Sequence, residues 1–96
     1  MKIQLKQFGI TLSSRQAGEE AYNSIIPIIS EIDKKEAVEI DFDGISSFSP
    51  SWGDEFLTPL FRQLGEKLIL LKSDNLSVNA TVELLEDISG LKFNQK

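Results

Sequence analysis

The 96-residue chain contains no cysteine and no histidine. Without cysteine it cannot form disulfides, use a thiol as a nucleophile or bind a metal through thiolates. Without histidine it lacks the most common general base near neutral pH and a frequent zinc ligand. These absences exclude most hydrolase chemistry, so we expect a protein that is not an enzyme and that uses no cofactor and no metal.

Long apolar runs and blocks of basic residues are also absent. No apolar stretch approaches the roughly 18 residues that a membrane-spanning helix requires, and the start MKIQLKQF is too short and too polar for a signal peptide. The formal net charge is −5, and no basic cluster is available to neutralise phosphates. We therefore expect a cytoplasmic protein that binds neither membranes nor nucleic acid and whose partner presents a basic surface.

What the chain does contain is typical of one folded domain. Hydrophobic residues make up 41% and charged residues 26% of the sequence, as in ordinary globular proteins. A chain of this length has room for one compact core. We expect a single domain that spans residues 1–96.

Three segments have the patterns of β-strands. Residues 2–8 and 37–42 alternate between apolar and polar side chains, which is typical of a strand with one solvent-exposed face. Residues 68–71 are continuously apolar between two lysines, which predicts a central strand covered on both faces. The final LKFNQK is either a frayed tail or a short additional strand.

Three further segments, residues 17–32, 50–64 and 78–88, repeat apolar side chains every three or four positions, as amphipathic helices do. Pro27 and Pro59 each remove a helical hydrogen bond, so we expect a break or kink near residue 26 and a bend or early end in the second helix. Residues that favour helix starts precede all three segments: Ser13 or Ser14, Ser49 or Ser51, and Asn75 or Ser77.

The order β-α-β-α-β-α requires crossovers between parallel strands, at least in its later units. The first strand fits either an antiparallel or a parallel place in the sheet. We predict a small α/β domain with a mixed, mostly parallel sheet of three or four strands, and about three helices mainly on one face.

Four serines, Ser46, Ser47, Ser49 and Ser51, cluster before the second helix. In the simplest interpretation, one of Ser49 and Ser51 is the N-cap and the others are turn residues. Hydroxyls beside the free N–H groups of a helix start also suit a phosphate or a carboxylate. The turn could therefore serve a binding protein or, alternatively, a small enzyme or an anion or ligand carrier.

The second helix opens with Trp52, Asp54 and Glu55. In one interpretation, Trp52 anchors the first turn to the core and the carboxylates complement the positive end of the helix dipole. In the other, a partly exposed Trp52 is an interface anchor and both carboxylates bind a basic partner groove, together with Ser47 and Pro50.

Other charged residues have plainer interpretations. Glu39, Asp41 and Asp43 share one strand face, but a hard-cation site needs more converging oxygens than one strand supplies. We expect a solvated face, and if the first strand lies alongside, Lys2 and Lys6 are placed to pair with these carboxylates. Arg15 begins the first helix, where the dipole disfavours a cation, and a surface charge is its default interpretation.

The segment DFDGISSFSPSWGDEFL, residues 41–57, resembles the STAS-like domains of unknown function, which are related to bacterial anti-anti-sigma factors. The resemblance extends from about Ser14 to Ile88. It implies a STAS-like fold and a regulatory protein-binding module that docks through the Ser46–Ser51 turn and the second helix. The partner it implies is an anti-sigma-type ATPase or kinase.

In the anti-anti-sigma factors a partner kinase phosphorylates a serine of the matching turn. The resemblance places Pro50 at the acceptor position, so Ser51 or Ser49 is the phosphoacceptor only in a different register. The family also has an arginine at the position of Arg15 in SSRQAG, which implies that Arg15 contacts an anion or a backbone turn.

Overall fold

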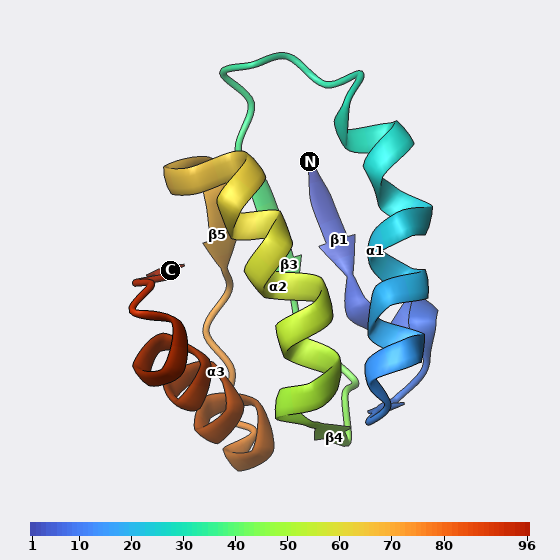
Figure 1. Ribbon diagram of the computed structural model, residues 1–96, viewed down its shortest axis with the longest axis vertical. Helices are drawn as coiled ribbons and strands as arrows, with labels where there is room; N and C mark the ends of the chain where they lie inside the picture. Colours follow the sequence, from blue (N-terminus) through green and yellow to red (C-terminus); the bar gives the residue numbers. More distant parts are fainter.

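The computed structural model describes all 96 residues and has two layers, a sheet and a set of helices (Figure 1). The main sheet has four strands, all parallel, in the order β1 (Lys2–Gln4), β3 (Val38–Asp41), β5 (Leu68–Leu70), β6 (Asn94–Gln95). A second, two-stranded parallel sheet is formed by β2 (Thr11–Leu12) and β4 (Ser47–Phe48).

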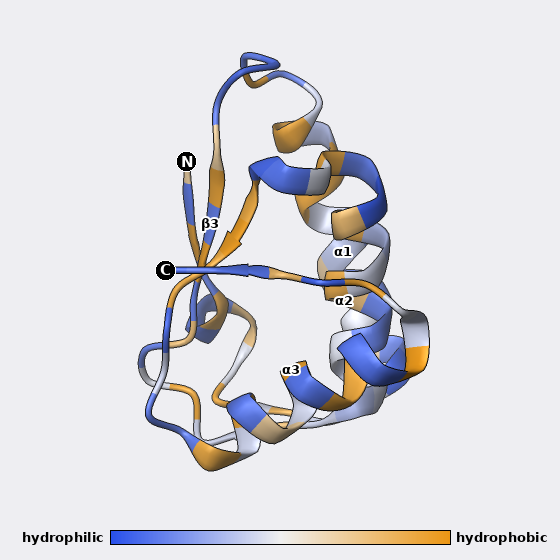
Figure 2. Cartoon of the chain, turned by 90° about the vertical axis from the view of Figure 1, so that its left-hand side faces the viewer, coloured by the Kyte–Doolittle hydropathy of each residue, from blue (hydrophilic) through white to orange (hydrophobic).

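Three α-helices and two short 3₁₀ helices complete the domain. Figure 2 shows that the α-helices all lie on one side of the main sheet. Because β1, β3, β5 and β6 follow one another in one direction across the sheet, right-handed crossovers place every connecting helix on the same face. The helices are α1 (Arg15–Ile29), α2 (Pro50–Leu64), α3 (Leu76–Ser89), η1 (Leu5–Phe8) and η2 (Gly65–Lys67).

The predicted α/β fold, with a mostly parallel sheet and helices on one face, is confirmed. Two open points are decided by the topology: β1 is parallel to β3, and the LKFNQK segment supplies β6. The strand at 68–71 is internal, between β3 and β6.

The prediction that this strand is covered on both faces is wrong. Leu68 and Leu70 are buried under the helices, whereas Ile69 points to the open face and is half-buried. No helix lies on that side, because all the crossovers run in one direction. A continuous apolar run therefore does not distinguish a strand with two covered faces from one that keeps an apolar residue on its open face.

An aromatic cluster holds α2, the central helix, against the sheet. The largest fully buried side chains are those of Trp52, Phe48 and Phe56. Trp52 stacks on Phe56 with ring centroids 4.9 Å apart and meets Phe48 edge to face at 5.8 Å. These contacts fix the start of α2, where the serine turn lies.

Neither internal proline ends its helix. Beyond Pro27, α1 continues to Ile29, and beyond Pro59, α2 continues to Leu64. Of the two alternatives predicted at each proline, the break near residue 26 and the early end of the second helix are therefore wrong. Each proline removes one N–H donor, but α1 packs along α2 and α2 packs on the sheet. Tertiary packing stabilises both helices despite the missing bond.

Candidate functional site

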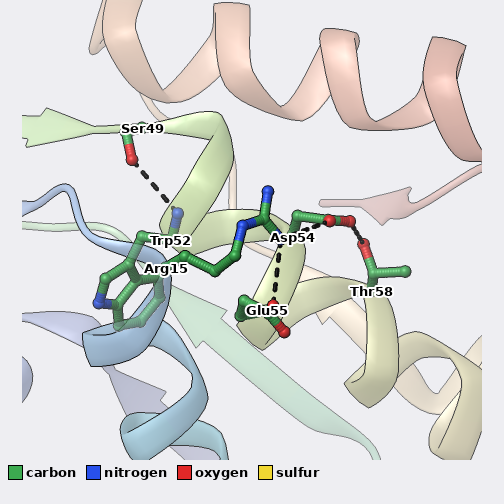
Figure 3. A network of polar contacts seen from close by, with 6 residues as sticks. All are labelled: Arg15, Ser49, Trp52, Asp54, Glu55 and Thr58. Atoms are coloured by element: carbon green, nitrogen blue, oxygen red, sulfur yellow. Dashed lines mark hydrogen bonds and ion pairs between the residues drawn. The ribbon is translucent and has the colours of Figure 1, made fainter.

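Ser49 is the N-cap of α2. Its Oγ accepts a hydrogen bond from the N–H of Trp52 at 3.2 Å (Figure 3) and donates one to the carbonyl oxygen of Ser13 at 2.6 Å. Pro50 follows at the first helical position, where its missing N–H is harmless. The Ser49 hydroxyl is thus engaged twice, and it ties the start of α2 to the segment that leads into α1.

The rest of the serine turn is held from two sides. The N–H groups of Ser46 and Ser47 both donate to the carbonyl of Ile10. From the other side, the Asn75 side chain donates to the carbonyls of Ile45 and Ser46 at 2.8 and 3.2 Å. The turn therefore has a defined shape before any partner binds.

Pro50 and Ser51 form the accessible edge of this turn. Pro50 is exposed, whereas Ser51 and Ser47 are half-buried. The Ser51 hydroxyl makes no hydrogen bond within the chain, in contrast to that of Ser49. Of the two candidate acceptors, Ser51 is the one with an uncommitted hydroxyl.

Trp52 lies in the core with only 1% of its surface exposed. The interpretation of Trp52 as a partner-binding anchor is therefore wrong, and the anchoring interpretation holds. The physical reason is the aromatic cluster, because Phe8, Phe48 and Phe56 surround the indole on the inner side of α2.

Asp54 and Glu55 are not left free for a partner. The Nη1 atom of Arg15 lies 3.1 Å from a carboxylate oxygen of each (Figure 3). Thr58 donates a further hydrogen bond to Asp54 at 3.0 Å. The anions that Arg15 contacts thus belong to this chain, because α1 and α2 pack side by side and bring the start of α1 next to the second turn of α2.

This pairing explains why a cation is tolerated at the start of α1. Hydrogen bonds to Glu55 and then Asp54 raise the pKa of Arg15 above its usual value. A raised pKa means that the pairing is fully present below the ordinary arginine pKa and is lost only as the pH rises through the raised one. Arg15 therefore stays charged under all ordinary conditions, and the carboxylates offset its unfavourable place on the helix dipole.

A shallow groove of about 210 Å³ lies between the first turn of α2 and α3. Of its six lining residues, one belongs to α1, three belong to the first residues of α2, and two belong to α3. Nothing in the sequence pattern indicated the α3 side of this groove: Ile88 belongs to the apolar periodicity of residues 78–88, yet it is 72% exposed. The lining residues are Arg15, Pro50, Ser51, Asp54, Leu85 and Ile88.

The acidic strand face does not form a cation site. Asp41 accepts a hydrogen bond from the N–H of Asp43 at 3.0 Å, which shapes the turn after β3. No group of three acidic side chains is close enough to hold a metal ion. Lys2 lies opposite Glu39 in the register, but no ion pair forms, and Lys6 lies in η1, so the expected pairing with these carboxylates is wrong.

The fold and site together define a parallel α/β domain wound in one direction, with a serine-capped central helix whose first turn borders a groove. The chain matches the model of the STAS-like domain of unknown function (DUF4325) over residues 17–79, more than half its length. It therefore belongs to this STAS-like family, as the 41–57 segment predicted. Neither curated proteins nor solved structures gave a match. None of the helices is both long enough and apolar enough to traverse a bilayer.

Proposed function

We propose that the protein is a non-catalytic module that binds a regulatory protein through the Ser46–Ser51 turn and the first turn of α2. The observation that carries this proposal is the position of Pro50 and Ser51. They line an open groove on a turn that is already held by hydrogen bonds from both sides. A surface ordered before binding loses less conformational entropy on association. Membership in the STAS-like family supports the same function.

The surroundings of Ser51 support a role without catalysis. A serine nucleophile needs a base within hydrogen-bonding reach. The Ser51 hydroxyl has no such partner, and the two charged residues that line the same groove, Arg15 and Asp54, are bound to each other. We expect no turnover of esters, peptides or phosphates.

The alternative function, an anion or ligand carrier, has less support from the geometry of the helix start. Pro50 has no N–H, the N–H of Trp52 is taken by Ser49 Oγ, and that of Gly53 donates to the Ser49 carbonyl. Only the N–H of Ser51 remains free in the first turn, and Asp54 lies in the same groove. An anion would find one donor and a carboxylate.

The proposed partner is an anti-sigma-type ATPase or kinase in the cytoplasm, as the relation to anti-anti-sigma factors implies. The half-buried Ser51, at the edge of the groove, is the proposed control point. A phosphate there would add negative charge beside Asp54, and it would change docking through electrostatics.

The test uses the full chain as bait in an extract of the source organism, followed by affinity measurement with the purified partner. We expect Ser51→Ala to bind within about threefold of the wild type and Ser51→Asp to bind at least tenfold more tightly, a difference of about 1.4 kcal/mol, because the added carboxylate faces a basic partner surface. Lys35→Gln is the matched control, because it changes the net charge by the same amount in the exposed α1–β3 loop, away from the turn (Figure 1). The absence of a stoichiometric partner, or equal binding by all variants, would contradict the proposal.

A further inference from the structure

Helix α3 carries an exposed apolar pair beside the groove. Ile88 is 72% exposed and Leu84 is 40% exposed. They lie one turn apart on the flank of α3 that also carries Ser77 and Thr81. Ser77 and Thr81 both bond to the backbone of Phe48, just before α2. The pair therefore lies on the side of α3 that faces the Ser46–Ser51 turn, and it extends the groove along α3.

Other exposed apolar residues do not form such a surface. Ile28 is 54% exposed near the end of α1, Ile10 is 57% exposed in the loop before β2, and Leu76 is 84% exposed at the first residue of α3, the opposite end of that helix from Ile88. Single exposed apolar side chains are common on protein surfaces and require no function. Leu84 and Ile88 differ because they adjoin each other and a groove whose floor includes Leu85.

The charges on α3 itself are all negative, and Asp87 is the one next to this pair, whereas Glu83 and Glu86 line a separate cleft together with Lys92. Helix α3 contains Glu83, Glu86 and Asp87 and no lysine or arginine. Across the groove, Arg15 is the sole cation among the lining residues, and it is already paired with two carboxylates. Ile88 also lies in the last turn of α3, where the helix dipole is negative. An apolar strip in such surroundings is complementary to a cationic amphipathic segment.

We propose that the Leu84–Ile88 strip of α3 is a second docking surface, which takes a basic amphipathic helix of the partner protein. The apolar face of that helix covers Leu84 and Ile88, and its lysines or arginines face Asp87 and the carboxyl end of α3. A second copy of this chain fits poorly, because two α3 helices would bring acidic faces together. This inference rests on the proposed function and specifies which kind of segment the partner presents.

The test titrates the ¹⁵N-labelled full chain with a synthetic helical peptide that has leucines on one face and lysines on the other. We expect amide shifts at residues 84–89 and in the first turn of α2. A peptide with glutamates in place of the lysines should cause none. Ile88→Lys should weaken binding of the lysine peptide at least tenfold, whereas Ile28→Lys, with the same charge change at a similarly exposed isoleucine, should stay within about twofold.

The proposal is overturned if the lysine peptide does not bind, if the shifts lie elsewhere, if both peptides bind equally, or if both variants weaken binding alike. A monomer-to-dimer shift that Ile88→Lys abolishes would identify a second copy as the occupant and overturn it too. Circular dichroism and unfolding midpoints establish that both variants fold.

Failure here is distinguishable from failure of the proposed function. If Ser51→Asp changes the affinity for the captured partner at least tenfold but Ile88→Lys leaves it unchanged, the serine-turn module stands and the α3 surface is wrong. If the wild type captures no partner, the proposed function fails, and the peptide titration still decides whether α3 binds basic helices.

Discussion

The two sides of α2 are built differently. Toward α1 the contact is closed: a Cβ atom at Gly18 would lie 2.5 Å from the carbonyl oxygen of Trp52, so the two helix backbones touch. Toward α3, a Cβ atom added at the corresponding glycine, Gly53, would lie 3.1 to 3.3 Å from side chains of Leu85, Phe48 and Thr81, and the groove opens beside them. The closed side contributes to stability, and the open side leaves surface for binding.

The largest expected effect on stability comes from Trp52, which anchors the start of α2 in the core. Trp52→Ala removes the centre of the aromatic cluster and should lower the free energy of unfolding by about 3 to 5 kcal/mol, as for other buried aromatic residues. Ile88→Ala, on the open side, should change it by less than about 0.5 kcal/mol. Urea unfolding measures both, and similar losses in the two variants would contradict the assignment of sides.

The two glycines allow a direct comparison of the helix contacts. Gly18→Ala forces the backbones apart and should cost about 1 to 3 kcal/mol, even though alanine favours the helix. Gly53→Ala meets only side chains that can shift by a few tenths of an ångström, so we expect a change within about 1 kcal/mol of zero. If Gly53→Ala lost more stability than Gly18→Ala, the α3 side of α2 would be the more tightly packed one, which would contradict the assignment of a closed and an open side.

Thr81→Val tests the hydrogen bond by which α3 is attached to β4, next to the start of α2. Thr81 is buried and its Oγ1 donates to the carbonyl of Phe48 at 2.6 Å. Valine keeps the shape but not the donor, so unfolding should become easier by about 0.5 to 1.5 kcal/mol. The remaining bond from Ser77 to the same carbonyl, at 3.3 Å, keeps the loss small. A Thr81→Val protein of unchanged stability would show that this hydrogen bond does not hold α3 in place.

The main elements could be predicted from the sequence because their patterns are local. Apolar periodicity locates all three helices, and Ser49 before Pro50 matches a helix start, as observed. Strands β2 and β4, with two residues each, are too short to show a pattern. The alternation in residues 2–8 is the same for a parallel as for an antiparallel strand, and the run at 68–71 did not reveal that Ile69 faces the open side.

The site was only half predictable for a related reason. A cap lies within three residues of the N–H it binds, so Ser49 was within reach of sequence reasoning. Arg15 is 39 and 40 residues from its two carboxylates, and only the packing of α1 on α2 brings them together. Periodicity likewise placed Ile88 near the apolar face of its helix, but it could not tell that no other element covers this residue, which is 72% exposed.

The smallest expected effect on stability comes from Arg15. Its guanidinium joins α1 to α2 by pairing with Asp54 and Glu55, and the same residue lines the open groove. Arg15→Gln removes an exposed pairing, so the urea midpoint should fall slightly, and the difference should shrink in 1 M salt, where screening is strong. Because the pKa of Arg15 is raised, the arginine itself causes no change in this difference between pH 6 and 9. The same substitution leaves Asp54 and Glu55 without their cation beside the groove, which should strengthen binding of a basic helix. Arg15→Lys is the control, because it keeps the charge and should leave the affinity close to that of the wild type. Weaker binding in Arg15→Gln would show that the guanidinium itself contacts the partner and that the closed side takes part in docking.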